Sequence, residues 1–138
     1  MIKTFLPILL LCSQLYIAQS LPIDFENSIV TADFVDFDGG TATVLPNPQS
    51  SGINTSATVA QIVRDGGAIW SGSKIYLAAN LDFSTMNTIR MKVYTSAPVG
   101  TVVKFKLEGS GSTERDATTT VSNEWEELSW DFTGEPAN

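Results

Sequence analysis

The chain contains no histidine, and it has a single cysteine, Cys12, close to its N-terminus. Without histidine there can be no Ser-His-Asp triad, no Cys-His nucleophile pair and no histidine-rich zinc site. A single cysteine also excludes an intramolecular disulfide framework. Any chemistry of the folded part must therefore use carboxylates, hydroxyls, amides, amines and aromatic rings.

The N-terminal segment has the pattern of a secretory signal. A lysine precedes the apolar run Phe5 to Leu11, and Ala18 and Ser20 supply the small-residue spacing that signal peptidases require. The apolar run is far shorter than the ~20 residues that span a bilayer. We predict a signal peptide over residues 1–20 and a secreted or cell-surface domain over 21–138, without membrane insertion after cleavage. Lipoprotein processing at the cysteine is a weaker alternative, because three leucines precede it where a small residue is usual.

The predicted mature domain is acidic and of single-domain size. It keeps seven basic and all fifteen acidic residues, so its net charge is about −8. This charge disfavours nucleic acid and anionic lipid as partners, and it fits a neutral ligand better. About 118 residues can form one hydrophobic core but not two, and without disulfides that core must hold the fold.

Short runs of alternating apolar and polar residues recur between Gly-, Pro- and Ser-containing turns, which predicts an all-β fold, a two-sheet antiparallel β-sandwich. The clearest runs, 88–94 and 102–107, are predicted to form a hairpin. Trp130 shares its strand face with Leu128 and Phe132 and is predicted to lie in the core. Strands are expected at 23–25, 42–45, 58–63, 74–77, 88–94, 102–107 and 127–132, and a long hairpin loop at 109–113.

The chain ends shortly after its last predicted strand. An exposed sheet edge at that point would invite aggregation. We therefore expect the domain to lack its last strand or strands.

Outward-facing aromatic side chains are the candidate ligand contacts, because flat rings stack on the apolar faces of sugar rings. Trp70 lies among small residues in the segment 66–72, where its ring could project into solvent or pack. Tyr76 and Tyr94 fall on outward faces by alternation. Trp125 begins a strand, and both orientations are open for it.

Basic residues would crowd the outward face of the predicted hairpin, at Arg90, Lys92, Lys104 and Lys106. As a binding surface they would form the floor of a polar groove for sugar hydroxyls, or a site for sulfated or uronate glycans. The alternative is a solvated face with ion pairs to Glu108, Glu127 and Asp131.

Carboxylates offer weaker candidates. Acidic residues cluster at 24–26 and at 33–38 before a glycine pair, but the spacing of an EF-hand calcium loop is absent. A carboxylate pair could hydrolyse a glycosidic bond. However, Glu126 and Glu127 point to opposite faces of their strand, so we predict no catalytic residue and a chain that is not itself an enzyme.

Five stretches of the predicted mature chain stand out: LPIDFE (21–26), NPQSSGINTS (47–56), LDFS (81–84), MKVY (91–94) and WEEL (125–128). Together they resemble a recurring domain of secreted Bacteroidetes proteins. The resemblance covers nearly all of the predicted mature chain, and it implies a jelly-roll of the galactose-binding or carbohydrate-binding-module type. In that family the domain is often attached to polysaccharide-degrading enzymes, which implies catalytic or sorting domains linked downstream.

The resemblance also implies a ligand and a metal. Related sugar-binding jelly-rolls hold a structural calcium between the first and last strands, and only the first half of that site carries over, onto Glu26 and Asp24. The E-x-D-x-x-E pattern of laminarinase-type domains does not occur. The resemblance therefore implies a non-catalytic module that binds polysaccharide, and the outward-facing aromatic residues predict that it binds through Trp70 or Tyr94. The alternative is a structural or adhesive β-sandwich spacer that binds no sugar.

Overall fold

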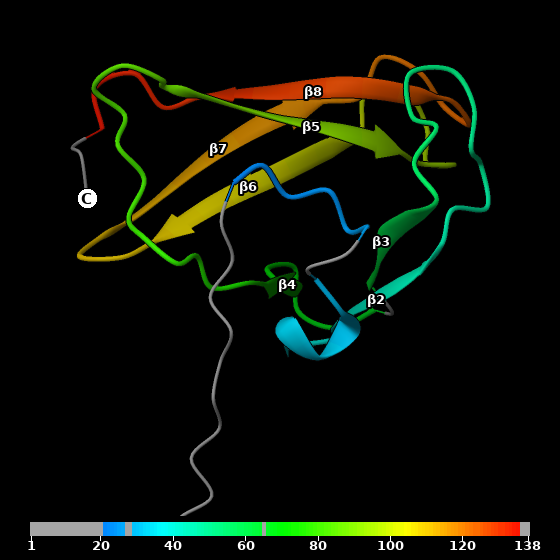
Figure 1. The fold of residues 1–138 in the computed structure, drawn as a ribbon, viewed down its shortest axis with the longest axis horizontal. Coiled ribbons are helices and arrows are strands. Elements are labelled where there is room, and N and C mark those ends of the chain that lie inside the picture. Colours follow the sequence, from blue (N-terminus) through cyan, green and yellow to red (C-terminus); the bar gives the residue numbers. More distant parts are fainter. Residues whose placement is uncertain (1–20, 27–28, 65, 136–138) are drawn as a thin grey trace, which may run out of the picture.

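The computed structural model describes residues 21–26, 29–64 and 66–135, and this part of the chain is built from β-strands (Figure 1). The predicted signal peptide, 1–20, lies outside the described residues. One 3-10 turn, η1 (Thr31–Asp33), precedes the strands. The strands are β1 (Val35–Phe37), β2 (Gly40–Pro46), β3 (Thr58–Arg64), β4 (Gly72–Lys74), β5 (Thr88–Tyr94), β6 (Val102–Glu108), β7 (Ser112–Thr118) and β8 (Trp125–Asp131).

The strands pair in two nested sets along the chain. In the first set β1 pairs with β4 and β2 with β3; in the second β5 pairs with β8 and β6 with β7. Every pairing is antiparallel, and the β2–β3, β5–β8 and β6–β7 ladders each run over seven residue pairs. The predicted all-β class and antiparallel sandwich are confirmed.

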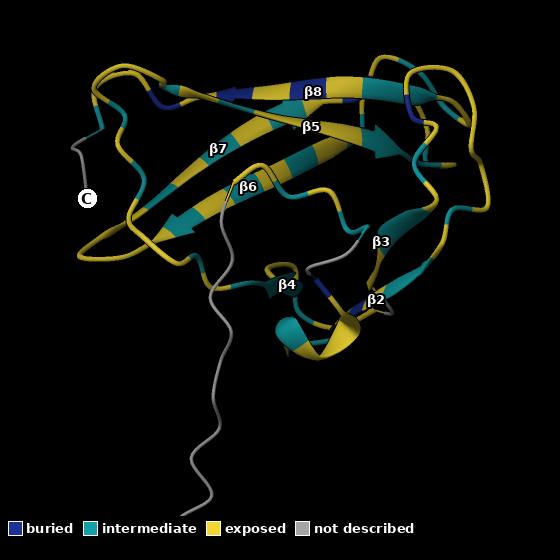
Figure 2. Ribbon diagram, in the orientation of Figure 1, coloured by how far each residue is buried: buried dark blue, intermediate teal, exposed yellow. Residues whose placement is uncertain are grey.

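The core lies between the β5–β8 and β6–β7 ladders. Leu128, Trp130 and Phe132 project from β8 and its end, and each is at most 5% exposed. Figure 2 shows the buried positions of β8 as dark blue bands that alternate with exposed ones. The Phe105 ring of β6 lies 5.3 Å from the Trp130 ring, and the Trp130 indole Nε1 donates to the Val103 carbonyl at 3.0 Å. The predicted core position of Trp130 is confirmed.

The predicted hairpin of 88–94 with 102–107 is wrong. Alternation along both strands is as expected, but their inward side chains face each other across the sandwich instead of lying in one sheet. The intervening loop crosses between the layers, where the Gly100 backbone N–H donates to the Thr119 carbonyl at 2.9 Å. The two runs therefore belong to different ladders.

The true partner of β6 is β7, which has no large apolar residue. Its intermediate positions are Thr113, Arg115 and Ala117. The Arg115 guanidinium lies 5.3 Å from the centre of the Phe132 ring and also pairs with Glu135 at 2.6 Å. The aliphatic stem of an arginine can thus cover the core in place of an apolar side chain.

The N-terminal strand predicted at 23–25 is absent, because this segment has no ladder partner and Phe25 has a left-handed φ of 59°. Instead, β2 is flanked by η1 and β1. The backbone N–H groups of Ala42 and Val44 are satisfied by the Asp36 carboxylate at 3.0 Å and the Thr31 hydroxyl at 2.9 Å. Side chains therefore cover the second edge of β2 in place of a neighbouring strand.

Removing an aromatic ring from the core should destabilise the domain strongly. We expect Phe132→Ala to lower the free energy of unfolding by about 3–5 kcal/mol, because the side chain is fully buried and its ring packs against those of Phe83 and Phe105. Val102→Ala is the matched control: its side chain is 56% exposed, and the change should cost less than about 0.5 kcal/mol. Urea unfolding followed by tryptophan fluorescence measures both, and equal losses would contradict this account of the core.

Candidate functional site: a cleft at Tyr94 and Trp125

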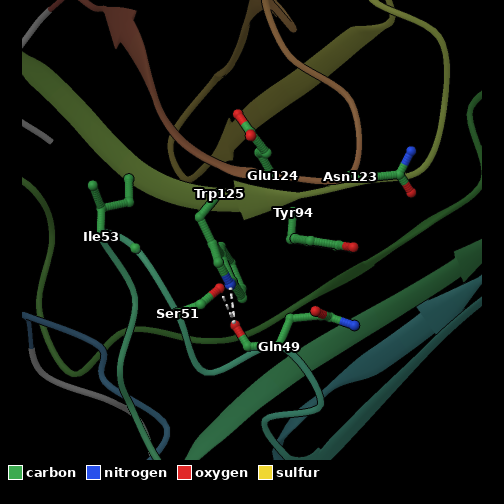
Figure 3. A pocket seen from close by; sticks show the side chains of 8 residues that line it. Gln49, Ser51, Ile53, Tyr94, Asn123, Glu124 and Trp125 are labelled. Carbon is green, nitrogen blue, oxygen red and sulfur yellow. Dashed lines mark hydrogen bonds between the residues drawn. The ribbon is translucent and has the colours of Figure 1, made fainter.

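A cleft of about 390 Å³ lies where the connection between β2 and β3 meets the end of β5 and the start of β8. Figure 3 shows its side chains from close by. The lining residues come from three separate segments of the chain: Gln49, Ser51, Gly52, Ile53, Tyr94, Asn123, Glu124 and Trp125.

Two aromatic rings form one side of the cleft. Tyr94 ends β5, Trp125 begins β8, and the two are direct partners in the antiparallel register. Direct partners project from the same face of a ladder, here the face opposite the core. The ring centroids are 5.6 Å apart with an interplanar angle of 57°, and both side chains are half-buried.

The Trp125 ring is fixed to the opposite wall. Its Nε1 donates a hydrogen bond of 2.7 Å to the Gln49 carbonyl, 76 residues away in the chain (Figure 3). The loop that carries Gln49 is itself closed, because Ser51 and Asn54 exchange two backbone hydrogen bonds of 3.0 Å around Gly52, which has a φ of 57°. This wall is preorganised by backbone contacts.

The third wall of the cleft is the segment 123–124 before β8, and hydrogen bonds hold it in place as they hold the loop of Gln49. Asn123 adopts a left-handed φ of 59°, and its backbone N–H donates to the Thr95 carbonyl at 2.8 Å. The Glu126 carboxylate accepts the Thr120 backbone N–H at 2.9 Å and its hydroxyl at 2.8 Å. These donors favour the charged carboxylate and lower the pKa of Glu126, the Thr120 backbone N–H contributing most. The segment between β7 and β8 is thus pinned at both ends.

The cleft offers aromatic faces together with amide and hydroxyl groups. Gln49, Ser51 and Asn123 present neutral donors and acceptors, and Glu124 is the charged residue of the lining. Since neither a cation nor a thiol is among the described residues that line this cleft, its chemistry fits a neutral, hydroxyl-rich ligand.

The structure separates the aromatic residues that the sequence proposed. Tyr94 lies in the cleft, and so does Trp125, for which the sequence left both orientations open. Trp70 and Tyr76 lie outside it. Tyr76 is 47% exposed beside the Lys74 ammonium, which lies 5.6 Å from the ring centre, and Trp70 is 67% exposed.

The predicted basic groove floor is wrong, because its residues lie on two ladders whose outer faces point away from each other. Most of these cations also have carboxylate partners. Arg90 pairs with Glu127 at 2.9 Å on β5–β8. On the other ladder the closest pairs are Lys104 with Asp116 at 2.7 Å and Lys106 with Glu108 at 2.8 Å. Lys92 takes part in no ion pair among the described residues.

Glu26 and Asp24, the residues carried over to a calcium site, make hydrogen bonds to backbone groups. The Glu26 carboxylate accepts the N–H groups of Ala57 at 2.7 Å and Thr58 at 3.3 Å, and Asp24 accepts the Glu26 N–H at 3.0 Å. Within the described ranges no three His, Cys, Asp or Glu side chains gather as metal ligands would. The calcium site stays a prediction, and Glu26 serves in this structure to hold the N-terminal segment to β3.

Comparisons with known proteins return nothing: no family model, no curated protein and no solved structure matches the chain. Among the described residues, no helix has both the length and the apolar character needed to span a membrane.

The ion pairs of Glu108 with Lys74 and Lys106 make a small contribution to stability that depends on pH. Lys106 and Lys74 lower the pKa of Glu108 from 4.5 to about 2 by donating to its carboxylate. A carboxyl whose pKa is lower in the folded state stabilises the fold above its unfolded pKa, and this contribution disappears as the pH falls from about 4.5 towards 2. Because these side chains are 41–44% exposed, solvent limits the effect to below about 1 kcal/mol.

Glu108→Gln should therefore lose less stability than the unchanged protein between about pH 5 and pH 2. Urea unfolding midpoints across this range measure the difference, and Glu124→Gln is the control, because Glu124 makes no ion pair among the described residues. Identical acid profiles for Glu108→Gln and the unchanged protein would rule out the lysine contacts as the cause.

Proposed function

We propose that this domain is a non-catalytic carbohydrate-binding module that holds a secreted polysaccharide-degrading or surface protein on its polysaccharide. The observation that carries the proposal is the aromatic pair of Tyr94 and Trp125, set in a cleft otherwise lined mainly by amide, hydroxyl and backbone groups. A sugar ring has apolar C–H faces and a rim of hydroxyls. Such a ligand matches both kinds of group in this cleft.

The fixed walls of the cleft support this proposal. Binding costs free energy whenever side chains and loops must become ordered on the ligand. Here the Gln49 carbonyl holds the Trp125 ring, and backbone hydrogen bonds hold the loops on both sides. A small ligand would meet a surface that is already formed, so a few stacking contacts and hydrogen bonds would suffice for useful affinity.

A structural or adhesive spacer is the second candidate, and one contact favours it. The bond from Trp125 to the Gln49 carbonyl ties the β2–β3 connection to the sandwich, a role that needs no ligand. In a spacer Tyr94 and Trp125 would pack this junction, and no sugar would occupy the cleft.

Affinity electrophoresis through gels containing laminarin, xylan or galactan distinguishes these candidates. We expect retardation by at least one polymer, and we expect Tyr94→Ala to weaken it at least about tenfold, equivalent to about 1.4 kcal/mol. Tyr76→Ala is the matched control, an exposed tyrosine outside the cleft, and it should bind as the unchanged protein does.

Folding of each variant is checked by its urea midpoint. Unretarded migration of the folded, unchanged domain on every polymer would refute the module and favour the spacer. Equal losses in Tyr94→Ala and Tyr76→Ala would mean that binding does not use the cleft.

A further inference from the structure

Outside the cleft, another large aromatic side chain, that of Trp70, is exposed on the loop between β3 and β4. Trp70 is 67% exposed and its neighbour Ile69 is 86% exposed, the highest value among the exposed large apolar side chains of the described chain. Single exposed apolar side chains are common on protein surfaces, but neighbouring ones that form a patch often mark a binding site. The loop therefore needs an explanation beyond packing.

Residues 68–71 of this loop are tied to neighbouring segments by hydrogen bonds, so the exposure of the Trp70 ring is part of the fold. Arg64, the last residue of β3, donates from its guanidinium to the Ile69 carbonyl at 2.9 Å and to the Ser71 hydroxyl at 3.0 Å. The Ala68 N–H donates to the Asp38 carbonyl at 3.0 Å. At Gly67 an added Cβ would lie 1.9 Å from the Asp38 carbonyl oxygen, so only glycine permits this close approach.

The orientation of the Trp70 ring is also set. Its Nε1 donates to the Asp38 carboxylate at 2.8 Å, and Asp38 has a left-handed φ of 53° in the turn between β1 and β2. The only polar atom of the indole is thereby satisfied, which leaves the ring faces for a ligand. The carboxylate at the ring edge can accept further hydrogen bonds, because an ionised carboxylate has about four acceptor sites.

We propose that Trp70 and Asp38 form a second sugar-stacking site, separate from the Tyr94–Trp125 cleft. The inference rests on the proposed function. An aromatic face with a carboxylate at its edge matches the C–H face and the hydroxyl rim of a neutral sugar. Ile69 and Trp70 alone supply far less than the ~800 Å² that each partner buries in a stable protein interface, whereas one exposed ring is enough to stack on a sugar. The carboxylates of Asp36 and Asp38 disfavour an anionic lipid surface.

The two sites lie at opposite ends of one ladder. The cleft loop joins Pro46 to Thr58 at one end of β2–β3, whereas the Trp70 loop follows Arg64, the partner of Gly40, at the other. Six residue steps of ~3.4 Å separate these ends by about 20 Å. A trisaccharide would occupy the sites independently, and a polysaccharide would engage both, with affinity raised by effective concentration.

The three tryptophans provide the test, because each reports a different environment. Indole N–H signals in ¹H–¹⁵N spectra are followed during titration with laminaritriose, xylotriose or galactotriose. Trp125 reports the cleft, Trp70 the second site, and the buried Trp130 is an internal reference for folding. We expect one trisaccharide to shift the signals of Trp70 and Trp125 along separate saturation curves and to leave that of Trp130 unchanged.

Variants separate the second site from the first. Trp70→Ala should keep the Trp125 titration within about twofold, yet weaken binding to the matching polymer (laminarin, xylan or galactan) about tenfold or more. Trp70→Phe keeps an aromatic face and should retain most of that affinity. An unchanged Trp130 signal establishes that each variant is folded.

Different failures have different meanings. A shift at Trp125 alone, with polymer affinity unchanged in Trp70→Ala, would overturn the second site and leave the cleft intact. If none of the three indole N–H signals shifts with any of the sugars, both proposals are overturned. Self-association in sedimentation that Trp70→Ala abolishes would place a second copy of the chain on Trp70 and overturn the sugar assignment there.

Discussion

The fold depends on the burial of one face of β8. Leu128, Trp130 and Phe132 are the largest part of the core, and the inward residues of β5, β6 and β7 are arranged around them. The same strand pairs with β5 through its backbone and packs on β6–β7 through its side chains. Because residues alternate along a strand, burying this face fixes which side chains point outward, Trp125 among them.

Alternation along the chain located β2, β3, β5, β6 and β8, but it missed β1 and β7 and predicted a strand at 23–25 that is absent. It predicted the pairing of the strands poorly. The run 88–94 coincides with β5, and the inward set of Val103, Phe105 and Leu107 is correct. Pairing went wrong because two amphipathic strands can bury their apolar faces either side by side in a sheet or face to face across a sandwich. Alternation is the same in both cases. β7 escaped detection because Arg115 covers Phe132 with its stem, a role that residue type alone does not reveal.

The sequence predicted single aromatic residues of the candidate site but not how they come together. Tyr94 was predicted to face outward by alternation, whereas for Trp70, which lies outside the cleft, the sequence left both an exposed and a packed ring open. The pairing of Tyr94 with Trp125 required the β5–β8 register, and the opposite wall required a contact across 76 residues. The basic groove floor failed with the hairpin on which it was built. Sites made by tertiary contacts of this kind leave no local signal in the chain.

The nested order of the ladders also has a kinetic consequence. β6 and β7 are joined by three residues and can meet early, whereas β5 must wait for β8, which begins 31 residues after β5 ends. Contacts between distant segments slow folding, because the chain entropy of closing the loop is lost before packing compensates for it. During synthesis, which starts at the N-terminus, β5 is made well before β8. Until β8 follows, β5 lacks its ladder partner, and β8 does not cover its apolar face. We therefore expect the β6–β7 hairpin to form before the β5–β8 ladder, and the Tyr94–Trp125 cleft, which needs both β5 and β8, to form late.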